Sequence, residues 1–253
     1  MANGSRRARG KTPCDGTLGF RGARRYRFEL SFASFPLCND AFKLKCCVDR
    51  LSPQPIAASQ LAPKNPTIYM TTLLIIDMQV GMTWPKAEVR NNHQAEETIA
   101  GLLRDWRLRK APVVHVRHIS RTPGSPFWPG QPGVEFQPEL SPLVHEHVVE
   151  KNVPDAFINT GLDRWLHTRG ESSIVIVGVS TNNSVENTAR TAGNLGFKTF
   201  VVSDCTYAYA KTDFNGVARS ADEVHAMALA NLDGEYATII RSGDALNSAH
   251  SLV

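Results

Sequence analysis

The sequence has 253 residues, of which 42% are hydrophobic and 21% charged, a composition typical of globular proteins. Its apolar runs stay far below the roughly 18 residues that cross a bilayer, so no membrane-spanning helix is predicted. The net charge of +4 is uneven: residues 1–69 carry +8, from 12 basic and 4 acidic residues, and residues 70–253 carry −4. A nucleic-acid-binding surface is therefore not expected on the folded part of the chain.

The first 69 residues differ in character from the rest. They show no sustained helical or strand period, and residues 52–66 contain four prolines, as linkers often do. Met70 stands directly before the first clean strand pattern, so we interpret it as the natural start and residues 1–69 as an over-called reading frame. The alternatives are an organelle transit peptide, favoured by the many arginines near the start, and a disordered basic extension. The domain to be explained is residues 70–253.

The cysteines follow the same division. Four of the five lie in residues 1–69, and Cys205 stands alone in the domain, where it has no partner for an intrachain disulfide. The first 20 residues lack the apolar segment of a secretory signal. These observations predict a reduced, cytoplasmic compartment, with Cys205 as a small buried residue.

From residue 71 onward, strand patterns alternate with helix patterns. In chain order we predict a strand at 72–76, a helix at 91–110, a strand at 112–118, a helix at 160–169, a strand at 173–177, a helix at 182–195, a strand at 198–203, a helix at 220–232 and a strand at 236–240. Residues 120–150 are rich in Pro and Gly and too long for a simple connector, so we expect a functional loop there.

This alternation predicts the fold class. The strands are apolar along their whole length, without the alternation of a half-exposed strand, as in sheets covered on both faces. We therefore expect an α/β protein with a doubly wound, mostly parallel sheet and helices on both faces, a Rossmann-like three-layer arrangement. In such sheets, ligands bind beyond the carboxyl ends of the strands.

Three polar side chains could perform chemistry in this fold. Asp77 directly follows strand 72–76, where burial would raise the pKa of its carboxyl and make it a base, although a loop or N-cap aspartate also fits. Lys151 follows the long loop and, taken alone, fits a solvated lysine. Ser184 lies in the first turn of helix 182–195, where backbone N–H groups favour an anion, although serine is also common at helix starts.

Taken together, the motifs around these residues resemble the isochorismatase-like (cysteine hydrolase) family. D-M-Q follows the first strand at 77–79, K-x-x-x-D-A-F spans 151–157, and G-V-x-T-N-x-x-V-E-x-T-A-R spans 178–190. The likeness extends to F-W-P-G-Q-P-G at 127–133 and to residues 222–227. Each motif is moderately specific, and their order along the chain makes the likeness strong. The sequence differs at Ser184, where most amidase members carry the nucleophilic cysteine.

The resemblance implies a role for each matched residue. Asp77 would be the general base, Lys151 the cation that stabilises the nucleophile, and Ser184 the nucleophile. The backbone N–H groups of Ser180 and Ser184 would form the oxyanion hole, and the peptide bond between Val179 and Ser180 would be cis. The implied activity is hydrolysis of a C–N bond in a small amide-like molecule.

The serine changes the chemistry that can be expected. A thiol near pKa 8.5 ionises readily beside a lysine, whereas a hydroxyl keeps its proton until a base removes it. Ser184 could still act as a nucleophile or orient a water. Alternatively, Asp77 could drive hydrolysis of a vinyl ether, as in true isochorismatases, or the site could bind a ligand without turnover.

The loops at the strand ends also contain residues that could bind a substrate. Candidates for contacts with a small-molecule substrate are Gln79, Trp84, Phe127, Trp128 and Phe157, although the aromatic residues could equally serve packing or a subunit contact. Arg117 could bind a carboxylate or pair with a surface acid. The nicotinamidase-like zinc set is missing, so we expect neither a metal nor another cofactor. The resemblance implies a homo-oligomer, a dimer or a tetramer.

Overall fold

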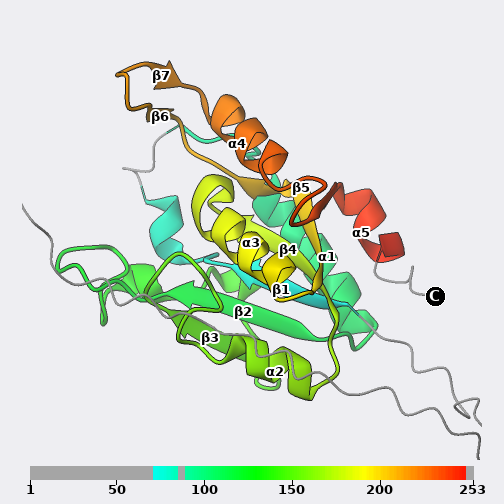
Figure 1. Cartoon of the computed structure of the whole chain (residues 1–253). Coiled ribbons are helices and arrows are strands. Elements are labelled where there is room, and N and C mark those ends of the chain that lie inside the picture. Colours follow the sequence, from blue (N-terminus) through cyan, green and yellow to red (C-terminus); the bar gives the residue numbers. More distant parts are fainter. Residues whose placement is uncertain (1–70, 85–88, 249–253) are drawn as a thin grey trace, which may run out of the picture. The chain divides into compact units, whose positions relative to one another are not determined.

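The computed structural model describes residues 71–84 and 89–248 (Figure 1). The predicted extension of residues 1–69 and the proposed start at Met70 lie outside the described residues. Within the described ranges, no helix is long and apolar enough to cross a membrane.

A six-stranded parallel sheet forms the centre of the domain (Figure 1), in the order β3-β2-β1-β4-β5-β8. The strands are β1 (Thr72–Ile76), β2 (Val113–His118), β3 (His147–Lys151), β4 (Ser173–Val179), β5 (Lys198–Tyr207) and β8 (Thr238–Ile240). The chain moves outward from β1 through β2 to β3, then returns to β4 and continues the other way. The point of reversal lies between β1 and β4, where ligands bind in such folds. The predicted α/β fold is confirmed.

Apolar side chains cover the sheet on both faces. On one face, Leu73 and Ile75 of β1 pack with residues of α1 (Ala95–Leu108) and of α5 (Ser242–Ser248). On the other, Leu74 and Ile76 pack with residues of α2 (Leu162–Thr168) and α3 (Glu186–Asn194). All five side chains of β1 are buried, because the strand is covered from both sides. The uninterrupted apolar strands of the sequence therefore reflect a three-layer structure.

Two strands differ most from the prediction. Residues 147–151 form edge strand β3, and Lys151 is its last residue. We had predicted that this segment ends the long loop, with Lys151 directly after it. Burial alternates along this strand, as on a sheet edge with one exposed face. Strand β5 continues four residues past its predicted end to Tyr207, after a register shift relative to β4.

The remaining helices and strands connect or flank these layers. Helix α4 (Ala221–Ala230) begins with a capping box. The Ser220 hydroxyl accepts from the Glu223 N–H, and the Glu223 carboxylate accepts from the Ser220 N–H. Before it lies a hairpin of two short strands, β6 (Lys211–Thr212) and β7 (Ala218–Arg219), which we did not predict. The long loop contains two short 3₁₀ turns, η3 (Pro132–Val134) and η4 (Pro138–Leu140), and a third, η2 (Val80–Thr83), follows β1.

Candidate functional site

The chain turns at Asp77, directly after β1. Asp77 has a φ of 51°, in the left-handed region that aspartate tolerates better than most residues. Its N–H still donates to the Val116 carbonyl of β2 at 2.9 Å, so the turn begins directly at the strand end. The residue as a whole is 1% exposed. A carboxyl group is thereby fixed in a nearly dry environment beyond the sheet.

Lys151 reaches the same place from the end of β3. Its Nζ donates to Asp77 Oδ2 at 2.7 Å and to Ser184 Oγ at 3.3 Å. Strand β2 lies between β3 and β1, so the lysine side chain extends past the end of β2 to make these bonds. The structure thus brings together Asp77, Lys151 and Ser184, which are 74 and 33 residues apart in the chain.

Ser184 lies in a turn of π-helix, η5 (Thr181–Val185), which follows β4 and leads into α3. The peptide bond between Val179 and Ser180 is cis, as the resemblance implied. Just before it, Gly178 has a φ of 117°, and a Cβ at this position would lie 2.1 Å from the Ile76 carbonyl oxygen. Only glycine therefore lets β4 approach the end of β1 this closely. Ser184 is 6% exposed, in the first turn where we predicted it.

Burial and the neighbouring polar groups shift the pKa of Asp77 in opposite directions. Burial raises the pKa of Asp77, while the Lys151 ammonium and the Ser184 hydroxyl favour the ionised form and lower it. Asp77 Oδ2 is occupied by Lys151, whereas the buried Oδ1 has no hydrogen-bond partner. A buried acceptor without a donor is costly in a folded protein. This oxygen is available to accept a proton from a group that enters the site.

Gln79 connects three chain segments around this centre. Its Oε1 accepts from the His118 N–H at 2.8 Å, and its Nε2 donates to the carbonyls of His118 at 3.1 Å and Val134 at 2.8 Å. The side chain is fully buried. All of these side-chain hydrogen bonds are made to backbone groups. The Gln79 amide therefore holds the loop in place and has no free group to bind a substrate.

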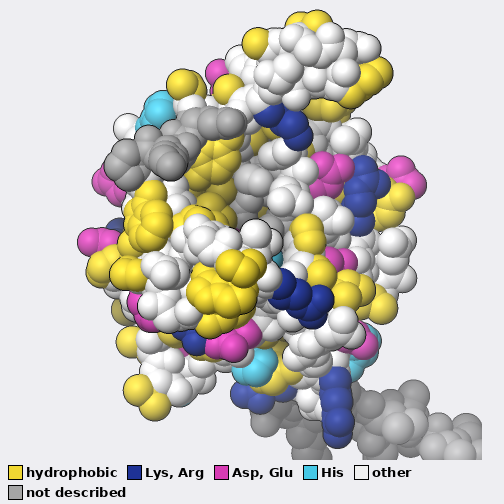
Figure 2. All heavy atoms as spheres, turned by 90° about the vertical axis from the view of Figure 1, so that its left-hand side faces the viewer, with side chains coloured by type: hydrophobic (Ala, Val, Ile, Leu, Met, Phe, Trp, Pro, Cys, Tyr) yellow, Lys and Arg dark blue, Asp and Glu magenta, His cyan; other side chains and the backbone are white. Residues whose placement is uncertain are grey.

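The aromatic candidates separate into two groups. Phe127 packs against Gly81, where an added Cβ would lie 2.7 Å from its ring, and makes an edge contact with His118 at 6.1 Å between ring centroids. Trp128 is half-buried and Trp84 is 36% exposed. Phe157 differs: it is 8% exposed and packs in the core with Phe197 at a centroid distance of 5.9 Å. Figure 2 shows the molecule from the side at which the strands end, with hydrophobic side chains around a hollow.

Two histidines of β2 face opposite sides of the sheet. His115 is fully buried and contacts Glu146 at 2.9 Å, whereas His118 lies on the side of Lys151, its register partner on β3. Sequence reasoning identified the end of this strand as a place for functional residues but assigned no role to His118. Arg117, the candidate carboxylate binder, instead pairs with Glu150, through Nε at 2.9 Å among other contacts.

Comparison with known proteins identifies the family of this chain. A family model of the isochorismatase domain matches residues 71–244. The chain belongs to the isochorismatase family. The uncharacterized isochorismatase family protein YrdC of Bacillus subtilis is 35% identical and aligns with 69% of this chain and 94% of its own length. The maleamate amidohydrolase of Pseudomonas putida is 28% identical over 71% of this chain and 87% of its own.

A solved structure shows the same family fold. It is that of a protein from Chromobacterium violaceum assigned to the isochorismatase family, which is 47% identical and has a TM-score of 0.71. The likeness covers 76% of this chain and 99% of the other. The isochorismatase fold expected from the motifs is therefore confirmed.

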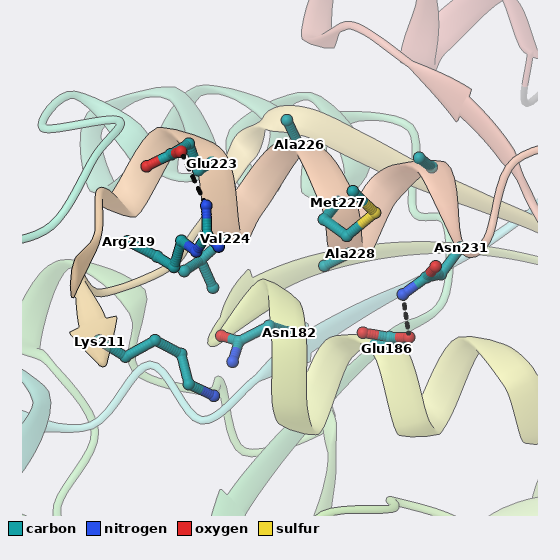
Figure 3. Close-up of a pocket in the computed structure, with 11 residues that line it drawn as sticks. Asn182, Glu186, Lys211, Arg219, Glu223, Val224, Ala226, Met227, Ala228 and Asn231 are labelled. Carbon is teal, nitrogen blue, oxygen red and sulfur yellow. Dashed lines mark hydrogen bonds and ion pairs between the residues drawn. The ribbon is translucent and has the colours of Figure 1, made fainter. Parts of the chain in front are cut away.

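A large cavity among the described residues of this isochorismatase-family chain lies beside the candidate site. It has a volume of about 810 Å³ and lies between α4 and the start of α3, with Lys211 of β6 at one end (Figure 3). Asn182 and Glu186 line it from the helix that carries Ser184, but Asp77, Lys151 and Ser184 do not. Asp77, Lys151 and Ser184, where the polar contacts converge, therefore remain the candidate catalytic residues. Among residues 71–84 and 89–248, no group of three or more His, Cys, Asp or Glu converges as metal ligands would.

Proposed function

We propose that this isochorismatase-family protein hydrolyses a C–N bond in small amide-like molecules, with Asp77 as the base, Lys151 as the cation and Ser184 as the acyl acceptor. The observation that carries this proposal is the double contact of the Lys151 ammonium, which holds Asp77 Oδ2 and Ser184 Oγ at once. A base, a cation and a hydroxyl in mutual contact are the parts of an activated nucleophile. The name of the Pseudomonas relative, an amidohydrolase, supports the choice of an amide bond.

The geometry suggests how the hydroxyl would react. Lys151 donates to Ser184 Oγ, so it occupies a lone pair of the hydroxyl and leaves the proton free to point elsewhere. Asp77, with its raised pKa and unpartnered Oδ1, is the base in reach. The proton would pass to Asp77 while Oγ bonds to the carbonyl carbon. When the C–N bond breaks, Asp77 would return that proton to the leaving amine, and Ser184 would hold the acyl group as an ester.

The developing oxyanion needs donors at the same point. We propose that the backbone N–H groups of Ser180 and Ser184 supply them, because both lie in the turn between β4 and α3, at the positive end of a helix. Such preorganised donors are typically worth about 3 kcal/mol of transition-state stabilisation each.

The surrounding loops would bind the rest of the substrate. We assign Trp84, Phe127 and Trp128 to the walls of the pocket, and we assign Gln79 and Phe157 to the support of the loops and the core, because of their contacts. That the protein acts in the cytoplasm, and that it forms a homo-oligomer that helps to close the pocket, stay predictions.

A test of the proposed function compares the full-length chain with Ser184→Ala and Asp77→Asn. Each protein is incubated with a panel of amides, ureides and isochorismate, and products are measured by mass spectrometry. We expect turnover of an amide by the unmodified protein and a loss of roughly a thousandfold or more in both variants, since nucleophile and base act as a unit. Ser172→Ala, on an exposed residue before β4, and Asp105→Asn, on α1, are controls that should keep full activity.

The competing interpretations give different results. Vinyl-ether hydrolysis driven by Asp77 predicts that Ser184→Ala keeps most of its activity while Asp77→Asn loses it. A silent binding protein predicts that ligands are recovered unchanged from every sample. Either result would reject the amide hydrolase.

A further inference from the structure

A histidine lies at the end of the strand between the two charged members of the site. Strand β2 pairs with β1 on one side and β3 on the other, so its last residue, His118, lies between the strand ends that carry Asp77 and Lys151. His118 is the register partner of Lys151 on the parallel neighbour β3, and paired residues of adjacent strands point to the same face of the sheet. The imidazole and the Lys151 side chain are therefore neighbours on the face that meets Ser184.

The histidine is held in place without using its ring nitrogens. Both backbone polar groups of His118 are bound by the buried Gln79 amide, and the ring is fixed by its edge contact with Phe127. Among the described residues, no hydrogen bond to its ring nitrogens is formed. The side chain is half-buried, whereas Asp77 is 1% exposed. Within the part of the chain that the structure describes, the ring is thus a positioned proton acceptor without a hydrogen-bond partner, and it is more exposed than Asp77.

We propose that His118 is the catalytic base of the second step, in which water hydrolyses the acyl group held by Ser184; this inference rests on the proposed function. One imidazole nitrogen would take a proton from the water as its oxygen bonds to the ester carbon. The C–O bond to Ser184 then breaks, and the imidazolium returns the proton to Oγ. The acid leaves, and Ser184 and His118 recover their starting protonation states.

The charged groups around the ring favour this role. Burial and the nearby Lys151 ammonium lower the pKa of His118, and the Asp77 carboxylate acts in the opposite direction. The ring is therefore neutral at pH 7, the state that accepts a proton. We expect deacylation to slow in acid, at a pH below the ordinary imidazole range, when the ring becomes protonated.

The test follows acyl transfer on Ser184 directly. p-Nitrophenyl acetate is added to the full-length protein and to His118→Gln, and intact-mass spectrometry follows the acetyl group, with peptide mapping to locate it. We expect His118→Gln to be acetylated at Ser184 at about the wild-type rate but to lose the acetyl group roughly a hundredfold more slowly. The decline in deacylation at low pH should disappear in this variant.

Two further samples guard against an indirect effect. His93→Gln changes an exposed histidine before α1 and should deacylate as the wild type does. Imidazole added to His118→Ala should restore part of the deacylation rate, which a merely structural role of the side chain would not allow. Urea unfolding of each variant shows whether the fold is intact.

The other outcomes overturn the inference in distinguishable ways. If acetyl-Ser184 forms in His118→Gln and disappears at the wild-type rate, His118 is not the base, and the proposed function stands. If acetylation and deacylation fall by the same factor, or added imidazole restores nothing, the assignment to the second step is wrong. If the wild type never acylates Ser184, the serine mechanism fails and this inference fails with it.

Discussion

Lys151 and Asp77 form an ion pair of 2.7 Å in which the lysine side chain is fully buried and the aspartate side chain is 2% exposed. The two residues come from strands that are not neighbours, since β2 lies between them. A buried charge is tolerated only when it is paired, so the burial of each charged side chain depends on the presence of the other.

Lys151→Met should therefore destabilise the fold as well as abolish activity. The variant leaves the Asp77 carboxylate buried without a cation, which should lower the free energy of unfolding by about 3–5 kcal/mol at pH 7. Urea unfolding measures this, with Lys110→Met, on an exposed lysine, as the control. Without Lys151, the strongest influence that lowers the pKa of Asp77 is lost and burial raises this pKa further. The loss of stability should therefore shrink as the pH is lowered and the carboxyl becomes neutral. A loss that is small at pH 7 would mean that the pair contributes little.

Ser184→Cys should create a reactive thiol. The Lys151 ammonium would stabilise the thiolate, so iodoacetamide should modify residue 184 at pH 7 about tenfold faster than in the double variant Ser184→Cys/Lys151→Met. Cys205 serves as an internal control, because burial and the nearby Asp204 raise the pKa of its thiol and keep it unreactive. Peptide mapping separates the two sites. Equal rates with and without Lys151 would show that the lysine does not activate this position.

The stability of the protein should fall in acid because of Glu146. Burial opposes ionisation of this carboxyl, but hydrogen bonds from Arg107 and the Leu143 N–H, with the nearby His115, outweigh it and lower its pKa to about 2. Its stabilisation is therefore present above its unfolded pKa near 4.5 and is lost as the pH falls from there toward 2.

The variant Glu146→Gln removes this dependence. We expect it to be less stable than the wild type at pH 7 by about 2 kcal/mol, with the difference shrinking between pH 4.5 and pH 3. Thermal unfolding across this range checks the prediction, and the exposed Glu139→Gln should behave as the wild type does. A gap that stays constant with pH would contradict the assignment.

Gly178 and Gly216 offer a matched pair of glycines. Both have positive φ, 117° and 80°, but a Cβ at Gly178 would strike the Ile76 carbonyl whereas one at Gly216 would meet nothing within 4 Å. Gly216→Ala should cost about 1–2 kcal/mol from backbone strain alone. Gly178→Ala should cost more than about 4 kcal/mol or prevent folding, since backbone must move. Similar losses in the two variants would show that the close approach is unimportant.

The sequence allowed the centre of the sheet and the site to be predicted, but not the sheet's edge. Strand β1 is apolar throughout because both of its faces are covered. The sequence therefore shows an uninterrupted apolar run that stops at Asp77, which made the strand easy to predict. Strand β3 is five residues long, alternates in burial and ends in a lysine, so in sequence it resembles the loop before it. Lys151 was identified from its motif, and the strand that positions it was not.

Two residues show why a motif does not determine the direction of a side chain. Phe157 lies in the same motif as Lys151, but its N–H donates to Asp155 Oδ1 at 2.8 Å in a local turn, and its ring enters the core beside Phe197. His118 has no motif of its own. Its proximity to Asp77 and Lys151 arises only when three strands align, which requires knowledge of the strand order.

The hydrogen bonds of Gln79 also bear on how substrate preference could change in this family. They hold His118, which precedes the long loop, and Val134, the last residue of the η3 turn. Both ends of residues 119–133 are therefore attached to one buried amide. Because the buried Gln79 amide holds both ends, we expect changes of side chains inside this stretch to alter substrate preference with little effect on the positions of Asp77 and Ser184. Protein engineers could therefore vary side chains within residues 120–133 and leave Gln79 unchanged.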